Sequence, residues 1–185
     1  MAFSPTGEIS TKIQTITIPH SVKTIGAYAF SNFNDLIQIE IPSTVLQFDD
    51  HLFSKCKNLQ EVYIFAKQSY LSDYTFLGCK SLRTVGMTNY ITTIGSYCFA
   101  NCETIERIDL PNGIECINDF AFYNCSKLRD IGNLSNVEYI RDYAFYGCNS
   151  LEEISLSSEV QLDDCSFYKC RNLERISFNS TSTRA

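Results

Sequence analysis

The stretch "DYAFYGCNSL" at residues 142–151 sets the architecture, because close copies of it recur along the chain. Similar segments are "AYAFSNFNDL" at 27–36, "DYTFLGCKSL" at 73–82, "SYCFANCETI" at 96–105 and "DFAFYNCSKL" at 119–128. One phenylalanine marks each of seven copies: Phe30, Phe53, Phe76, Phe99, Phe122, Phe145 and Phe167. Five of the six intervals are 23 residues and the last is 22. A fixed period of this kind predicts a solenoid of stacked repeats.

Other apolar residues keep the same register and predict the core. A leucine or isoleucine stands six residues after each marker phenylalanine, and an isoleucine or valine stands nine after it. Around the second position, apolar and polar residues alternate, as in a strand with one buried face. A unit of 23 residues cannot enclose its own apolar side chains. We therefore expect the units to stack in parallel and to bury each column against its copies.

Segments such as "EYIRDYAFYGC" (138–148) favour a short helical turn around each phenylalanine. An aspartate precedes five of the phenylalanines by three residues, where it could cap the turn (Asp50, Asp73, Asp119, Asp142 and Asp164). Bound cations are the alternative for this column. Two residues after the phenylalanine, Asn or Gly in five of seven copies predicts a left-handed exit. The predicted fold is an α/β repeat solenoid, with a parallel β-sheet along one face and short helical turns on the other.

One solenoid domain is expected over residues 1–185, with repeats over about 16–175, a partial repeat at 176–178 and a polar tail at 179–185. Asn133 and Gln68 replace apolar core residues, so loose packing or an inserted polar contact is expected there. The first residues lack the features of a secretory signal. No apolar run approaches the ~20 residues that cross a bilayer. A net charge of −6, with both signs interspersed, argues against nucleic-acid binding.

Six of the nine cysteines are interpreted as packing residues, whereas Cys98, Cys116 and Cys165 lie off the column that they form. Six share one column, in which the first copy has Phe33, so this column is apolar (Cys56, Cys79, Cys102, Cys125, Cys148 and Cys170). A line of thiols ~5 Å apart does not converge on a metal ion, and parallel Cβ vectors suit disulfides poorly. An odd number of cysteines leaves at least one thiol free. We predict no metal and no cofactor, and the pair Cys98 and Cys102 is weak evidence for a metal.

Catalysis is not predicted. The two histidines, His20 and His51, are interpreted as exposed loop or packing residues, and no phosphate loop, HExxH or GxSxG motif occurs. Tyrosines two residues before the marker phenylalanines form another column, with His51 and Phe120 in the same positions. Packing along the outer wall is the expected role of this column, and an exposed stripe for ligand stacking is the alternative.

The repeats resemble BspA-like leucine-rich repeats. The segments that carry the likeness are "IPHSVKTIGAYAF" (18–30), "IERIDLPNGIECINDFAFYNCSKL" (105–128) and "YIRDYAFYGCNSLEEISL" (139–156), and it covers about residues 13–178. The resemblance implies a curved or nearly straight solenoid with a parallel sheet along one face. Members occur in mucosal bacteria and parasitic protists, where adhesion and protein binding are the usual proposals. Free thiols favour the cytoplasm and the resemblance favours the cell surface, so the location stays open.

The outward side of the sheet is the predicted site of binding to another protein. The candidate residues there are Glu61, Tyr63, Arg107, Asp109 and Asp130, with shallow floors at Gly86 and Gly132. A merely solvated sheet surface is the alternative. The predicted function is a non-enzymatic protein-binding module, in surface adhesion or host interaction. A solenoid that self-associates through its ends, or an intracellular scaffold, is the alternative.

Overall fold

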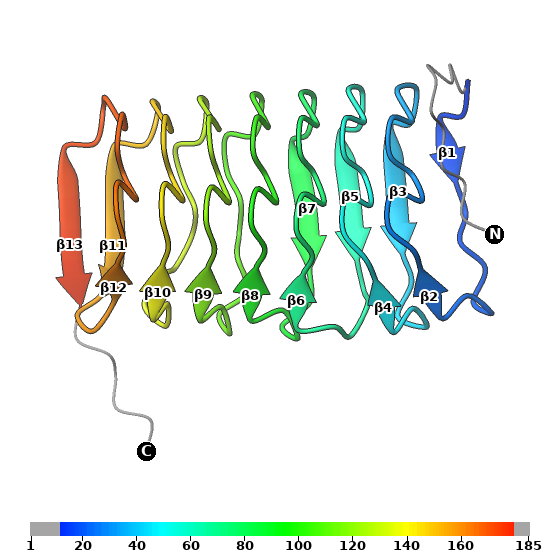
Figure 1. The fold of residues 1–185 in the computed structure, drawn as a ribbon, viewed down its shortest axis with the longest axis horizontal. Coiled ribbons are helices and arrows are strands. Elements are labelled where there is room, and N and C mark those ends of the chain that lie inside the picture. Colours follow the sequence, from blue (N-terminus) through cyan, green and yellow to red (C-terminus); the bar gives the residue numbers. More distant parts are fainter. Residues whose placement is uncertain (1–11, 180–185) are drawn as a thin grey trace.

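The computed structural model describes residues 12–179, which wind through a row of stacked coils (Figure 1). Every paired strand is parallel to its neighbour. One sheet has the order β1 (Thr15–Ile16), β3 (Gln38–Ile41), β5 (Glu61–Ile64) and β7 (Thr84–Met87). On the same side, β11 (Glu153–Ser157) pairs with β13 (Arg175–Asn179).

Short strands form a second side of the stack. Here β2 (Thr24–Ile25) pairs with β4 (Gln47–Phe48). A separate sheet has the order β6 (Tyr70–Leu71), β8 (Thr93–Ile94), β9 (Cys116–Ile117), β10 (Tyr139–Ile140) and β12 (Gln161–Leu162). Each strand residue pairs with the equivalent residue of the next repeat: Ile94 pairs with Ile117, and Ile140 pairs with Leu162 of the shortened repeat. The predicted parallel strands and their columns are confirmed.

The core runs the length of the stack, because each apolar column packs on its own copies. The rings of Phe53, Phe76 and Phe99 have no exposed surface, and their centroids lie 5.7 and 5.2 Å apart. The strand positions alternate as expected, since Val62 and Ile64 are buried while Tyr63 between them is exposed.

The segments around the phenylalanines are not helical turns, and the predicted α/β class is wrong. Residues 12–179 contain no helix, and the fold is a parallel β-solenoid. The N–H groups of Tyr28, Phe30 and Asn32 donate to carbonyls of the next coil, at 3.1, 3.1 and 2.9 Å. The N–H groups of Ala29 and Ser31 instead donate to carbonyls three residues back. These segments are therefore successive β-turns joined from coil to coil, whereas a helix would use all these groups within itself.

Backbone dihedrals explain the alternation. All seven residues two positions after the marker phenylalanines have φ between 57° and 73°, which confirms the left-handed exit. A second left-handed column was not predicted: the seven residues two positions before, from Tyr28 to Cys165, have φ between 54° and 60°. Left-handed residues interrupt a helix, because helices need consecutive right-handed dihedrals. The two columns turn every second N–H toward the neighbouring coil.

Three of the five aspartates in the column cap the next coil and not a helix within their own. One carboxylate oxygen of Asp73 accepts the N–H of Ser96 at 2.7 Å, and one of Asp142 accepts the N–H of Asp164 at 2.9 Å. Asp50 receives the N–H of Asp73 in the same way, at 3.2 Å. The prediction that these carboxylates accept backbone N–H groups is thus correct, but the N–H groups belong to the next coil and not to a helical turn.

The two departures from the apolar pattern have different outcomes. Gln68 makes the inserted polar contact, because its amide accepts the N–H of Phe48 at 2.9 Å and donates to the carbonyl of Tyr70 at 2.6 Å. It bridges β4 and β6, which do not pair with each other. Asn133 was wrongly placed in the core. The chain bulges at Gly132 (φ 73°), which leaves Asn133 exposed and puts Leu134 into the core.

The cysteine column is part of the core, which confirms the packing prediction. Five of its six members are buried, and Cys170 is half-buried. Each thiol also donates to the carbonyl of the phenylalanine one coil back, at 3.0–3.3 Å, a contact that the sequence did not reveal. Burial raises the pKa of Cys56 and Cys125 to about 12. These thiols remain protonated at neutral pH and are poor nucleophiles.

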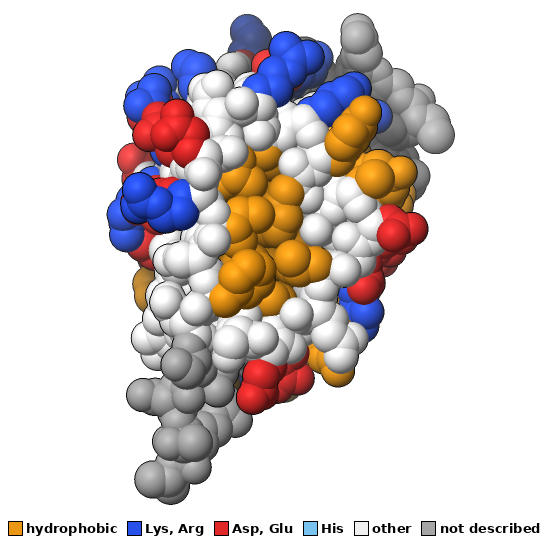
Figure 2. Space-filling view, turned by 90° about the vertical axis from the view of Figure 1, so that its left-hand side faces the viewer, with side chains coloured by type: hydrophobic (Ala, Val, Ile, Leu, Met, Phe, Trp, Pro, Cys, Tyr) orange, Lys and Arg blue, Asp and Glu red, His pale blue; other side chains and the backbone are white. Residues whose placement is uncertain are grey.

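The C-terminal end of the stack carries an apolar patch at its centre (Figure 2). Leu162, Ile176 and Phe178 of the last coil are 40%, 39% and 55% exposed. Residue 179 ends β13. The rest of the predicted tail, 180–185, and residues 1–11 lie outside the described part of the chain.

Candidate protein-binding surface

The sheet formed by β1, β3, β5 and β7 presents every second side chain to solvent. On β5, Glu61 and Tyr63 point outward, because Val62 and Ile64 fill the core on the other face. In the coils beyond β7, Arg107 and Asp109 flank the buried Ile108 in the same way. All five predicted site residues therefore lie on the outward face.

Tyr63 is held against the sheet by a glycine in the next strand. A Cβ atom at Gly86 would lie 2.7 Å from the Cδ1 atom of the Tyr63 ring, so the ring rests where a side chain would otherwise stand. The residue is still 40% exposed, and its hydroxyl lies 3.5 Å from a carboxylate oxygen of Glu61. The predicted shallow floor at Gly86 is thus occupied by Tyr63 itself, which leaves one side of an ordered ring open to a partner.

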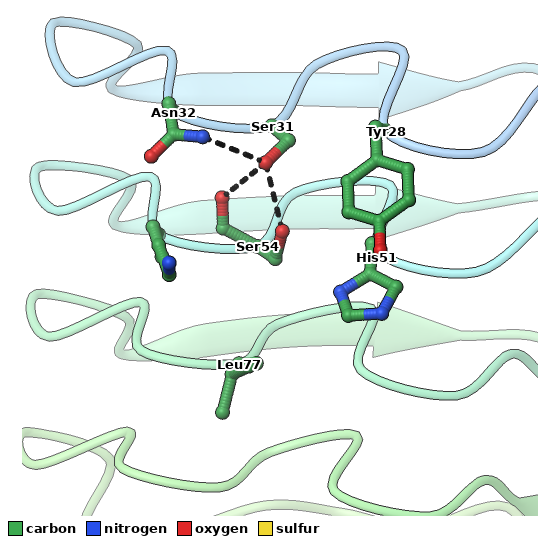
Figure 3. A pocket seen from close by; sticks show the side chains of 7 residues that line it. Tyr28, Ser31, Asn32, His51, Ser54 and Leu77 are labelled. Carbon is green, nitrogen blue, oxygen red and sulfur yellow. Dashed lines mark hydrogen bonds between the residues drawn. The ribbon is translucent and has the colours of Figure 1, made fainter. Parts of the chain in front are cut away.

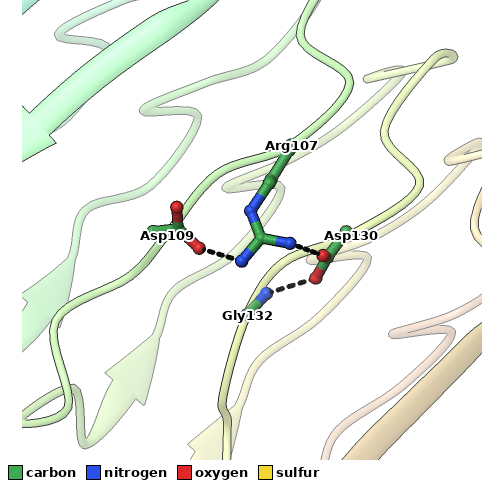
Figure 4. A network of polar contacts seen from close by, with 4 residues as sticks. All are labelled: Arg107, Asp109, Asp130 and Gly132. Atoms are coloured by element: carbon green, nitrogen blue, oxygen red, sulfur yellow. Dashed lines mark hydrogen bonds and ion pairs between the residues drawn. The ribbon is translucent and has the colours of Figure 1, made fainter.

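Arg107, Asp109 and Asp130 form one polar network (Figure 4). The guanidinium of Arg107 donates to Asp109 at 2.5 Å and to Asp130 of the next coil. The pKa of Arg107 is raised above its usual value, mainly by the hydrogen bond to Asp109 and next by the charge of Asp130. Asp130 also accepts the N–H of Gly132 at 2.8 Å, so the network supports the bulge. Its carboxylates partly neutralise Arg107 before any partner arrives.

The structure separates the five residues into two groups. Glu61 and Tyr63 lie on β5, and the Arg107 network lies two coils further on, with β7 between them. Sequence reasoning missed a hollow beside the network, of about 840 Å³. Its lining includes Gly132, Ser155 and the ion pair of Glu153 with Arg175 at 3.0 Å. The only sequence indication was the missing side chain at Gly132.

The tyrosine column on the turn edge is a continuous stack, which confirms packing as its role. Rings from Tyr28 to Tyr143, including His51 and Phe120, have centroids 4.3–5.0 Å apart and planes within 11° of parallel. The stack covers the ring faces and exposes only edges, so it offers no flat face along its length for ligand stacking. His51 lies between two tyrosines. Burial lowers its pKa below 6.5, and this effect outweighs the charges of Asp50 and Asp73, which raise it.

Among residues 12–179, no group of three or more His, Cys, Asp or Glu side chains could hold a metal ion. The described part of the chain also has no helix long and apolar enough to cross a membrane.

Two overlapping segments, residues 8–105 and 92–185, match the sequence profile of the BspA type leucine rich repeat region, with six copies. A search of the curated proteins finds no match. Solved structures of bacterial leucine-rich repeat proteins share the fold. A Bacteroides ovatus protein is 24% identical with a TM-score of 0.75, and the alignment covers 96% of this chain and 51% of that one. The chain thus spans about half the length of that protein.

A leucine-rich repeat protein of T. pallidum is 22% identical, with a TM-score of 0.71, over 88% of this chain and 79% of that one. A third, from Eubacterium ventriosum, is 23% identical with a TM-score of 0.59, over 94% of this chain and 39% of that one. These likenesses concern the fold.

Proposed function

Because this chain belongs to the BspA-type leucine-rich repeat family, we propose that it is a non-enzymatic protein-binding module whose partner docks on the outward face of the sheet. Leucine-rich repeat families generally act as protein-interaction modules. The outward positions of the sheet have no packing role, so their charged and aromatic side chains are free to contact a partner. Surface adhesion, host interaction or an intracellular scaffold would each use such a surface.

The observation that carries this proposal is the position of Tyr63. Its ring is exposed, yet it rests on Gly86, which restricts the positions open to the ring, so less side-chain entropy is lost on binding. Tyrosine and arginine are the residue types that most often dominate interface energies. Tyr63, Glu61 and the Arg107 network would meet a partner together, since they lie on one face.

Affinity capture with the intact chain would supply the partner for the test. We expect the double variant Tyr63→Ala with Arg107→Ala to weaken binding at least tenfold, because truncation of a single such anchor already costs ~2 kcal/mol. Thermal unfolding should change little, because exposed ion pairs contribute little to stability. The control pair is Tyr74→Ala with Tyr97→Ala on the turn edge. Binding that survives the first pair of changes and fails with the second would place recognition on the turn edge.

Self-association through the solenoid ends is the second candidate, and the apolar patch on the C-terminal end (Figure 2), where Leu162, Ile176 and Phe178 are exposed, favours it. Exposed apolar surface at an unpaired strand edge promotes association. Light scattering across a concentration series tests this candidate. A mass that rises with concentration and returns to the monomer value in Phe178→Glu would support it, and a constant monomer mass would exclude it.

A further inference from the structure

The turn edge carries a groove that is filled in some coils and open in others. Its floor is the row of residues one position after each marker phenylalanine, here named the floor row: Ser31, Ser54, Leu77, Ala100, Tyr123, Tyr146 and Tyr168. The aromatic stack stands on one side of the groove, and the left-handed exit residues stand on the other. In the last three coils, tyrosines occupy the floor row. In the first two coils, serines leave the space open.

Tyr146 shows how the groove holds a tyrosine ring. The ring stacks on Tyr123 with centroids 4.8 Å apart, and it lies tilted to Tyr143 of the aromatic stack at 6.0 Å. Lys169, an exit residue of the next coil, places its ammonium 4.9 Å from the centre of the Tyr146 ring and donates to its hydroxyl. The ring thus has one stacked and one tilted aromatic contact, and a cationic hydrogen-bond donor for its oxygen.

The open part of the groove repeats part of this environment without the ring. It is a hollow of about 350 Å³ lined by Tyr28, Ser31, Asn32, His51, Ser54, Lys55 and Leu77 (Figure 3). Lys55 is an exit residue one coil after Ser31, just as Lys169 follows Tyr146, and their φ angles are 62° and 61°. Tyr28 occupies the place of Tyr143. Two of the groups that contact the Tyr146 ring, a tyrosine of the aromatic stack and an exit-residue lysine, therefore have counterparts around Ser31, whereas the stacked ring of Tyr123 has none among the described residues.

The polar groups on the floor of the hollow already have hydrogen-bond partners within the chain. The hydroxyls of Ser31 and Ser54 are 2.8 Å apart and hydrogen-bonded, and the amide of Asn32 donates to Ser31 at 3.1 Å. Both serines are buried, at 4% and 2% exposed. A ligand therefore needs no polar group against the floor. It needs a flat apolar body against the Tyr28 and His51 edges, and an acceptor near Lys55.

We propose that this hollow binds a phenol ring, in the position that the floor-row tyrosines occupy in the last coils. The ring would lie over Ser31, with its oxygen accepting a hydrogen bond from the Lys55 ammonium. The ring could be a free phenol or the tyrosine side chain of a protein. The hollow lies on the turn edge, so the proposal is independent of binding at the sheet face.

The test is a titration of the whole chain with p-cresol, the side-chain analogue of tyrosine, followed by NMR. We expect saturable shifts of the His51 imidazole and of the Ser31 and Ser54 amides. Toluene, which lacks the oxygen, should bind more weakly. Lys55→Met should lower the affinity about two- to tenfold, as expected for the loss of one exposed hydrogen bond. The matched control Lys169→Met removes the equivalent cation beside Tyr146 and should leave the affinity unchanged.

Ser31→Tyr supplies the ring from the chain itself and should abolish p-cresol binding, with the spectrum showing that the protein stays folded. If that variant does not fold, the comparison of Lys55→Met with Lys169→Met decides. The proposal is overturned by a lack of saturable binding, by equal affinity for toluene, or by an equal response to the two lysine changes. The blocked peptide Gly-Tyr-Gly distinguishes the sources. Binding of both probes assigns the site to a protein's tyrosine, and binding of p-cresol alone assigns it to a free phenol.

Discussion

Truncation of Phe99 to alanine tests whether the stack is stabilised from both sides of every coil. The Phe99 ring is fully buried, and its faces stack on Phe76 at 5.2 Å and on Phe122 at 5.0 Å. Removal of a buried phenylalanine side chain costs ~3–5 kcal/mol. Because Phe99 also loses two ring contacts, each worth ~0.5–1.5 kcal/mol beyond burial, the cost should fall in the upper half of that range.

Phe167→Ala is the matched control at the C-terminal end. Phe167 has the same chemistry and the same place in its repeat, but it is only partly buried and stacks on one ring, Phe145, at 5.2 Å. With one neighbour in place of two, its truncation should cost about 2 kcal/mol.

Urea unfolding followed by circular dichroism measures both costs. We expect a larger loss of unfolding free energy for Phe99→Ala, and for Phe167→Ala a smaller loss with fraying of the last coil before the main transition. Equal losses at the two sites would refute a linear array in which each coil is stabilised by its neighbours.

Three further predictions concern titration and backbone contact. Burial raises the pKa of Cys56 and Cys125 from 9.0 to about 12, so above pH 9 the folded state keeps protons that the unfolded chain releases. The free energy of unfolding should therefore be constant up to about pH 9 and fall above it. Denaturant titrations in which it stays constant to pH 11 would contradict this. Burial lowers the pKa of His51, so its neutral form adds stability above pH 6.5 that is lost as the pH falls, and an NMR titration midpoint above 6.5 would be inconsistent with the stack. Gly95→Ala should lower thermal stability by ~1–3 kcal/mol, because its Cβ would lie 2.5 Å from the Leu71 carbonyl, whereas Gly113→Ala, with a nearest contact of 3.5 Å, should change little.

The sequence predicted the columns because periodic burial leaves a direct trace in residue type. Ile39, Val62 and Val85 stand at one position of successive repeats, and the structure pairs them in register. The same reasoning identified the cysteine column as packing, since Phe33 could replace a thiol there. Burial restricts what a position accepts, so a position buried in every repeat is visible without a structure.

The turns could not be predicted, because their form depends on hydrogen bonds between coils. A segment such as 138–148 has residues compatible with a helix, and left-handed tyrosines are rare enough that Tyr143 gave no warning of φ 55°. The bulge at Gly132 was hidden for a similar reason. A register counted from the phenylalanines places Asn133 in the core, and only the backbone shows that Leu134 takes that place.

The candidate site was predicted in part, because alternation along a strand tells which side chains point outward but not how they meet. It placed Tyr63 and Arg107 on the solvent side, where the structure has them. It did not show that Tyr63 lies over Gly86, or that Asp109 and Asp130 already engage Arg107. These contacts join residues of neighbouring coils, and their geometry depends on side-chain conformations that no column reveals.

The two proposed surfaces follow from one property of the solenoid. The core columns must stay apolar in every coil, so coils can differ only where a side chain leaves the core. The outward strand positions and the floor row are two such places. In the floor row the chain changes from Ser31 and Ser54 to Tyr123 and Tyr146, while the phenylalanine before each of them stays the same. A groove that is closed by its own tyrosines at one end and open at the other thus arises without any change to the core. Binding specificity in such a fold can change coil by coil, because substitutions in either row leave the phenylalanine column unchanged.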